Sequence, residues 1–233
     1  MDINPFGTVS SYSKMLRKIG FFNFCFSLIA VMYLASRVPK LDRLLDWGSS
    51  TVTWASITIG VGAFLVAVVF TGLSRIFKLH DRVSDILGIR AAFDVHEILM
   101  PMALASGVSL PVDKVPEISR RRNDLMHRVF YKYASSDPSR TRIDPHYVTM
   151  ALDQWCWYWV VVEAAVIAAT TGIVLIISGQ PAEACGALVT VALLTAVLKG
   201  IMRGCRRYAY QEVQQIMAQE DTAEAVAEVF RAL

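Results

Sequence analysis

Glu163 is the residue of this chain that most directly indicates chemistry. It lies eight residues after Trp155, in a stretch from Trp155 to Ile177 that is otherwise uncharged. An ionisable side chain at membrane depth is costly, so such residues typically mark ion pathways or gating elements. A carboxylate near the cytoplasmic headgroups, or one neutralised by a neighbouring helix, fits the same position. We expect Glu163 to be a pore or gating residue, with these two structural roles as the alternative.

Hydroxyl side chains form a second polar feature at the start of another apolar stretch, Trp54 to Ser74. Thr51, Ser56 and Thr58 belong to this group. Hydroxyls along a helix can line an aqueous path, and they also form hydrogen bonds between helices. These three residues are therefore candidates for lining a pore, with helix contact as the alternative.

The histidines and cysteines match no catalytic or metal-binding motif. His80-Asp81 lacks the further ligands of a metal phosphohydrolase, and His96-Glu97 is not part of an HExxH motif. The chain contains no phosphate-binding loop, no dinucleotide glycine motif and no G-x-S-x-G motif, and its four cysteines occur singly. We predict no enzyme activity, no cofactor and no metal site. Four side chains would have to converge in space to support an enzyme: His80, Asp81, Asp94 and His96.

The elements that must position these residues are apolar helices. A hydrocarbon core of about 30 Å requires roughly 20 residues of helix. The chain is 55% hydrophobic, with a mean hydropathy of +0.44, and 18% charged. We predict an all-α integral membrane protein with four transmembrane helices, a helical cytoplasmic insertion between the second and third, and an amphipathic C-terminal helix. The four stretches are Ile19 to Ser36, Trp54 to Ser74, Trp155 to Ile177 and Ala184 to Leu198, the last extendable to Met202.

The expected organisation has four parts. Residues 1–74 form an N-terminal cytoplasmic segment and the first two transmembrane helices, and residues 75–153 form a cytoplasmic helical region. Residues 154–202 hold the third and fourth transmembrane helices, and residues 203–233 form a cytoplasmic amphipathic helix. Within this plan, Asp144-Pro145 is an N-cap followed by a proline at the first helical position, which predicts a helix from Pro145 to Ile177.

The distribution of charge predicts the orientation in the membrane. Twenty of the 23 Lys and Arg residues flank the apolar stretches on one side, and cytoplasmic segments carry such an excess. We expect a bacterial inner-membrane protein with both termini and the central region in the cytoplasm. The remaining three basic residues are Arg37, Lys40 and Arg43, in a segment whose apolar residues predict a short surface helix.

Small residues mark the expected contacts between helices, because lipid provides no hydrophobic driving force for packing. Alanine and glycine recur at every fourth position along the last span, and Gly60 lies in the second. We expect contacts within one chain or between chains, and we predict a homo-oligomer. The predicted packing residues are Ala192, Ala196, Gly200, Gly204 and Gly60.

Basic residues gather on a predicted helix from Glu117 to Tyr133. Such a cluster can bind anionic headgroups or a phosphorylated ligand, although the positive-inside rule alone also produces a solvated basic face. Across residues 75–153, twelve basic residues face ten acidic ones, so no broad positive field and no nucleic-acid partner are expected. The candidate residues are Arg120, Arg121, Arg122, Arg128 and Lys132.

Two further amphipathic segments are expected in the cytoplasm. The second span should continue as a helix from Ile76 to Leu87, with a break at Gly88. The tail after Gly204 carries apolar patches around Ile216 and Phe230, and an apolar face on a cytosolic helix needs a partner. We expect that partner to be the central region or a neighbouring subunit.

The layout, a small four-span chain with a helical cytosolic insertion, resembles the membrane effectors of bacterial anti-phage defence systems. The resemblance covers organisation only and implies a role in perturbing the inner membrane. We therefore expect a homo-oligomeric gated pore or membrane-perturbing effector controlled by its cytoplasmic helices. The alternative is a non-conducting membrane anchor or sensor that recruits a soluble cytoplasmic partner.

Overall fold

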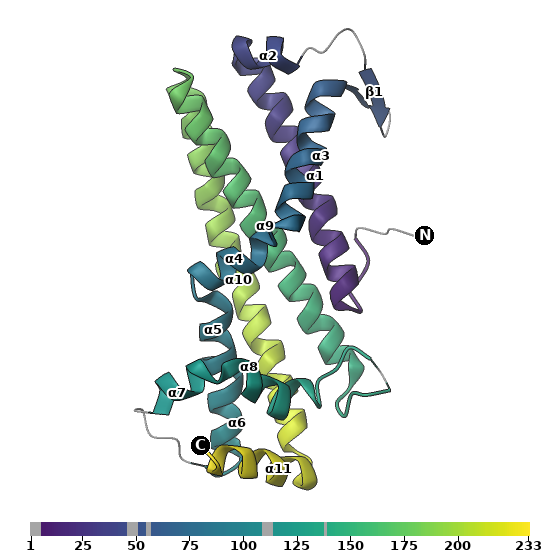
Figure 1. The fold of residues 1–233 in the computed structure, drawn as a ribbon, viewed down its shortest axis with the longest axis vertical. Coiled ribbons are helices and arrows are strands. Elements are labelled where there is room, and N and C mark those ends of the chain that lie inside the picture. The colour runs from purple at the N-terminus through teal and green to yellow at the C-terminus, as the bar shows by residue number, and fades with distance from the viewer. Residues whose placement is uncertain (1–5, 46–50, 55–56, 109–113, 138) are drawn as a thin grey trace. The chain divides into compact units, whose positions relative to one another are not determined.

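The computed structural model describes residues 6–45, 51–54, 57–108, 114–137 and 139–233. Within these residues the regular elements are helices, apart from one short two-stranded sheet (Figure 1). Two of the helical segments, η1 and η3, have π-helical hydrogen bonding. The elements are α1 (Tyr12–Arg37), α2 (Pro39–Leu45), β1 (Thr51–Trp54), β2 (Ile57–Gly60), α3 (Val61–Ile76), α4 (Leu79–Ile86), α5 (Ile89–Phe93), η1 (Asp94–Leu99), α6 (Met100–Ala105), α7 (Val115–Arg120), α8 (Arg122–Leu125), η3 (Met126–Tyr131), α9 (Pro145–Ile177), α10 (Pro181–Met217) and α11 (Glu220–Arg231).

The chain divides into two compact units, each built from segments that are distant in sequence. The apolar unit comprises Leu16–His80 and Cys156–Ile201. The charged unit comprises Met1–Met15, Asp81–Trp155 and Met202–Leu233. Helices α9 and α10 contribute residues to both units.

Within the described residues, three helices are long and apolar enough to cross a membrane, namely α1, α9 and α10. They contain 26, 33 and 37 residues, which correspond to roughly 39, 50 and 55 Å at the usual helical rise. Helices α3 and α4 together meet the same criterion but are bent by 56° at the break between them. The predicted bounds of α9, Pro145 to Ile177, are confirmed.

The predicted helix from Trp54 to Ser74 begins later than expected. An antiparallel pair, β1 and β2, precedes it, with Thr51 opposite Gly60 and Thr53 opposite Thr58, and α3 begins only at Val61. The physical reason lies in the side chains, because Thr, Val and Ile restrict rotation next to the backbone and favour strands. The apolar length of the segment therefore does not predict the structure of the residues that precede Val61.

The predicted helical continuation of this segment is interrupted between α3 and α4. Lys78 has a φ of 46°, a left-handed conformation that is uncommon for a residue with a side chain. This conformation ends α3 and redirects the chain into α4. The predicted break at Gly88 is confirmed, because Gly88 has a φ of 63° and precedes α5.

Helices α1 and α3 pack closely in the apolar unit and lie side by side in Figure 1. Leu28 packs against Ala63 and Ala67, whose small side chains allow two helices to approach. The rings of Phe24 and Phe64 meet edge to face, with 5.6 Å between their centroids. This contact fixes the two helices that supply the partners of Glu163.

Helices α9 and α10 form an antiparallel hairpin in the same unit. Gly179, with a φ of 76°, lies in the turn between them. Gly172 is buried, and a Cβ atom at this position would lie 3.2 Å from the Cβ of Ala187. The short α2, at the far end of α1, confirms the short helix that was predicted around Arg43.

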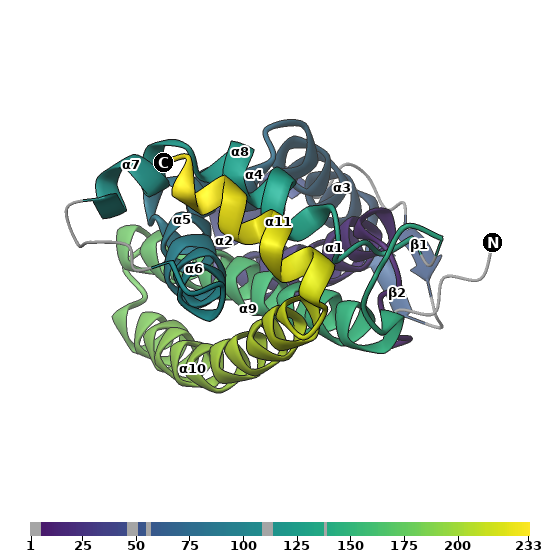
Figure 2. The same cartoon turned by 90° about the horizontal axis from the view of Figure 1, so that it is seen from below.

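The core of the charged unit forms where α11 contacts α6 and η3, a crossing that Figure 2 shows from below. Val226, Ala227 and Phe230 of α11 are buried in this core. The apolar face of the tail is thus covered by the central region, the first of the two partners that were expected. The other large side chains of the core are Leu99, Met102, Ile118, Leu125, Met126, Val129 and Ile216.

The predicted helix from Glu117 to Tyr133 consists of three shorter segments, α7, α8 and η3. A turn at Arg121 separates α7 from α8, and the hydrogen bonding then changes to the π pattern from Met126. A π segment widens the helix by one residue per turn and shifts the side chains that follow. The basic residues therefore do not share one continuous helical face.

Candidate functional site

Glu163 is buried in the apolar unit and hydrogen-bonded to another helix. Only 5% of the residue is exposed. The Nδ2 atom of Asn23, in α1, donates a hydrogen bond of 2.6 Å to its Oε2 atom. A short bond to a carboxylate is stronger than one between neutral groups. The structure thus favours a carboxylate engaged by a neighbouring helix over one in the headgroup region.

A third helix joins this arrangement through Thr71 of α3. Its Oγ1 atom donates a hydrogen bond of 3.3 Å to Oδ1 of Asn23. The amide of Asn23 can both donate and accept, so it links the hydroxyl to the carboxylate. We call Asn23, Thr71 and Glu163 the polar lock, because its three members join α1, α3 and α9.

A small cavity with room for about one water molecule adjoins the polar lock. The guanidinium group of Arg75 lines this cavity and donates a hydrogen bond to the carbonyl oxygen of Leu16. Gly20 lies so close to Arg75 that a Cβ atom there would overlap the guanidinium group. The polar residues of the lining are Asn23, Thr71, Ser74, Arg75, His80 and Glu163.

Two tryptophans of α9, Trp157 and Trp159, contact basic side chains in the apolar unit. The ammonium group of Lys18 lies 4.3 Å from the ring centroid of Trp157, a distance at which a cation is attracted to the ring face. The ring of His80 meets that of Trp159 edge to face at 6.1 Å. These contacts hold two basic side chains against the tryptophans of α9, a residue type that favours the headgroup zone.

The predicted hydroxyl candidates are not brought to Glu163. Thr51 lies in β1 and Thr58 lies in β2, whereas Ser56 lies outside the described residues. The described hydrogen bonds of the polar lock come from α1, α3 and α9 alone. Thr71, from the second half of the same apolar stretch, is the hydroxyl that joins the polar lock.

The predicted packing stripe on α10 is mostly open within the described chain. Ala192, Ala196 and Gly200 are exposed, and a Cβ atom at Gly200 would meet no atom of the described residues within 4 Å. Gly204 approaches the side-chain amide of Gln154, and Gly60 is exposed at the end of β2. Apart from Gly204, these residues do not serve as packing contacts within the described part of one chain.

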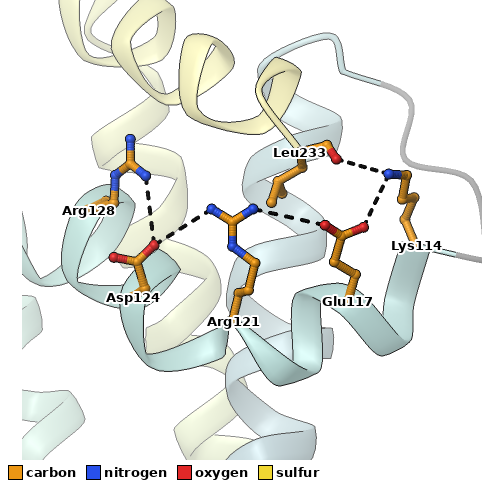
Figure 3. A network of polar contacts seen from close by, with 6 residues as sticks. All are labelled: Lys114, Glu117, Arg121, Asp124, Arg128 and Leu233. Atoms are coloured by element: carbon orange, nitrogen blue, oxygen red, sulfur yellow. Dashed lines mark hydrogen bonds and ion pairs between the residues drawn. The ribbon is translucent and has the colours of Figure 1, made fainter.

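Acidic partners engage three of the five basic candidates. Arg121 lies 3.9 Å from both Glu117 and Asp124, and Arg128 lies 3.7 Å from Asp124 (Figure 3). Arg122 pairs with Asp94. Lys132 lies over the ring of Tyr133, and Arg120 is exposed, with no ion pair among the described residues. The basic segment is thus largely an internal network of ion pairs.

Asp94 forms a buried ionic cluster in the charged unit. Its Oδ2 atom lies 3.6 Å from Nη1 of Arg122 and 3.9 Å from Nε of Arg90. Arg90 also donates a hydrogen bond of 3.3 Å to the hydroxyl of Tyr131. Burial raises the pKa of Asp94 to about 6, an effect that the two arginines oppose but do not cancel. The cluster joins η1 to η3, the two π segments.

The sequence did not reveal the partners of Glu163 and Asp94, two of the buried carboxylates. The sequence could have indicated a polar contact at Asn23, because an amide in the middle of the apolar stretch Ile19 to Ser36 needs a hydrogen-bonding partner. It does not indicate one at Asp94, which is one of many acidic residues in a charged region. In the described part of the chain, no three His, Cys, Asp or Glu residues are grouped to hold a metal ion.

These features define an α-helical protein of the membrane-associated class, with a buried polar contact inside its apolar unit. The chain belongs to the YmfE protein family, whose model matches residues 11–232. It is 23% identical over 186 residues to a protein of Escherichia coli (strain K12) with the name Uncharacterized protein YmfE, and the alignment covers 76% of this chain and 74% of that relative. No solved structure matches the chain.

Proposed function

We propose that this chain is a four-span, homo-oligomeric protein of the bacterial inner membrane that acts as a gated pore, with the polar lock as its closed gate. In this account the bent pair α3 and α4 forms the second span. The charged unit lies in the cytoplasm and controls the gate.

The observation that carries the proposal is the hydrogen bond between Asn23 and Glu163 beside a small cavity. A carboxylate this deep in an apolar unit is costly, and a purely structural contact between helices does not need an ionisable group. The bond joins α1 to α9 and, in this account, closes the path past Glu163 to hydrated ions. Opening would require these two helices to separate. The polar side chains of the lock would then line an aqueous path.

The arrangement of α10 supports the homo-oligomer. Within the described residues, no part of its most apolar window is buried, and its exposed side includes Leu193 and Val197 beside the small residues of the stripe. Small residues allow close backbone approach between spans. A second copy of the chain is the partner that this face fits in the proposed pore.

The proposed control rests on the continuity of α9. This helix runs without interruption from Asp144 and Pro145 to Glu163 and beyond. At its start, the backbone N–H of Asp144 donates to the side chain of Gln215, and Arg142 pairs with Asp221 at 2.6 Å. A change in the packing of the tail would therefore act directly on the helix that carries Glu163.

The resemblance in layout to anti-phage membrane effectors is the support for a role in defence, in which opening would depolarise the membrane. The second candidate function is a non-conducting anchor or sensor. Burial of Glu163 favours it, because a sealed polar lock is also what a static bundle requires. The covered face of α11 disfavours it, since that face is already used within the chain.

Ion flux through liposomes that contain the purified protein tests the proposed pore. The Glu163→Gln variant keeps the size and the acceptor oxygen of the side chain, so we expect it to fold and to change the flux by roughly tenfold or more. Thr170→Val is the matched control, because Thr170 is an exposed residue of α9 that bonds only to its own helix at the carbonyl of Val166. The mass of the oligomer in detergent is measured alongside.

Two outcomes decide between the candidates. A flux that changes in Glu163→Gln and not in Thr170→Val supports the pore. A folded oligomer that is equally silent in all three forms across a range of membrane potentials contradicts it and favours the anchor or sensor.

A further inference from the structure

We propose that the species that crosses the polar lock is the proton, relayed by a water molecule in the cavity between His80 and Glu163. This inference rests on the proposed function and specifies its substrate. It rests on the residues that line the cavity, on the size of the cavity, and on the buried hydroxyl of Ser27 in α1, which has no hydrogen-bond partner among the described residues.

The charge of Glu163 and the size of the cavity disfavour the other simple ions. Glu163 repels an anion, and a cavity with room for about one water molecule does not hold a hydrated metal ion. A metal ion also sheds its hydration shell only where several oxygen atoms replace it, as in the carbonyl rings of selective channels. The proton needs no such set of oxygen atoms, because it moves along hydrogen bonds through one water molecule at a time.

The groups that line the cavity are those that a proton relay requires. His80 and Glu163 can each take up and release a proton, and the cavity between them has room for about one water. The titratable and charged groups that face Glu163 here are Arg75 from α3 and His80 from α4. The α1 residues of the lining carry no charge, and the nearby Lys18 of α1 lies over Trp157.

Ser27 extends the polar side of α1 beyond the lock. It lies four residues after Asn23, hence on the same face of the helix. Ser27 is 4% exposed, and its Oγ atom has no hydrogen-bond partner among the described residues. A buried hydroxyl without a protein partner typically binds water. A second water here would receive the proton from Glu163.

Each transfer in the relay conserves charge and involves no redox partner. The His80 imidazolium gives a proton to the cavity water, which gives one of its own protons to the Glu163 carboxylate. The products are neutral imidazole and a carboxylic acid. The acid then releases its proton to the water at Ser27, and His80 takes up a new proton from water on its own side.

The test measures proton and potassium flux separately in liposomes that contain the full-length protein. A pH-sensitive dye inside the vesicles reports protons driven by a membrane potential, and a potassium electrode reports potassium. We expect proton flux in the wild type and a loss of roughly tenfold or more in Glu163→Gln. We expect a smaller loss in Ser27→Ala and no change in the control Thr170→Val. Potassium flux should stay at the level of empty vesicles.

The outcomes separate this inference from the proposed pore. Potassium flux without proton flux would overturn the relay and leave the pore standing, whereas the absence of both would overturn the two together. Infrared difference spectroscopy provides a readout that does not depend on gating. The relay predicts a carboxylic-acid band that responds to pH, shifts in D2O and is missing in Glu163→Gln. A Glu163 band that is insensitive to pH and to D2O would also overturn it.

Discussion

The Phe230→Ala variant is expected to lose about 3–5 kcal/mol of unfolding free energy in the charged unit. Phe230 is buried where α11 contacts α6 and η3, so its removal leaves a cavity between three segments. Thermal unfolding in detergent, followed by near-ultraviolet circular dichroism, measures the loss. Limited proteolysis should cut first in α11, because the helix would detach from the core.

Leu104→Ala is the matched control for this variant. Leu104 belongs to α6, the helix that α11 contacts, but it is 77% exposed. Its truncation should change the unfolding free energy by only about 0.5 kcal/mol or less. Equal losses in the two variants would show that α11 does not depend on the Phe230 contact.

The unfolding free energy should fall as the pH rises from about 4 to about 6, and Asp94 should account for part of that fall. Its pKa is about 6 in the folded protein, against an ordinary value of 3.8. Between these values the folded state binds more protons than the unfolded state, so stability decreases with rising pH. The full effect of a shift of this size is about 3 kcal/mol.

The Asp94→Asn variant isolates this contribution, because asparagine keeps the shape of the side chain and does not titrate. The difference between the wild-type and variant stabilities should change across this pH range and become constant above it. Asp124→Asn, at an exposed ion pair of α8, should retain the wild-type dependence. An Asp94→Asn curve that runs parallel to the wild-type curve would contradict the assignment.

The elements that could be predicted from the sequence are those in which local signals agree. Helix α9 combines an N-cap, a proline at its first position and a long apolar run, and it has the predicted bounds. The segment from Thr51 to Gly60 combines conflicting signals, since its apolar character suits a span whereas its Thr, Val and Ile residues suit strands. The strands prevail in the structure.

The break at Lys78 and the π segment η3 could not be predicted, because no glycine or proline lies in them. Pro101 follows η1 by two positions, but a proline alone does not indicate a π pattern. The positions of the break and of the π segments depend on packing within the folded chain, which overrides local preference.

For the candidate site, the sequence predicted the carboxylate but not its surroundings. Glu163 stands out because a charge in an apolar stretch is rare. Its partner Asn23, and Thr71, which bonds to Asn23, are 140 and 92 positions away along the chain. Only the packing of α1, α3 and α9 brings the three together, so nothing local distinguishes Thr71 from the hydroxyls near Trp54.

A double-variant cycle on ion flux most directly tests the claim that Asn23 and Glu163 act as one gate. The four proteins are the wild type, Asn23→Leu, Glu163→Leu and the variant with both changes. If the two residues form one lock, the double variant should differ from Glu163→Leu by no more than about twofold, because each single change already removes the hydrogen bond between them. Effects that multiply independently in the double variant would show that the two residues act separately and would contradict the polar lock as the gate.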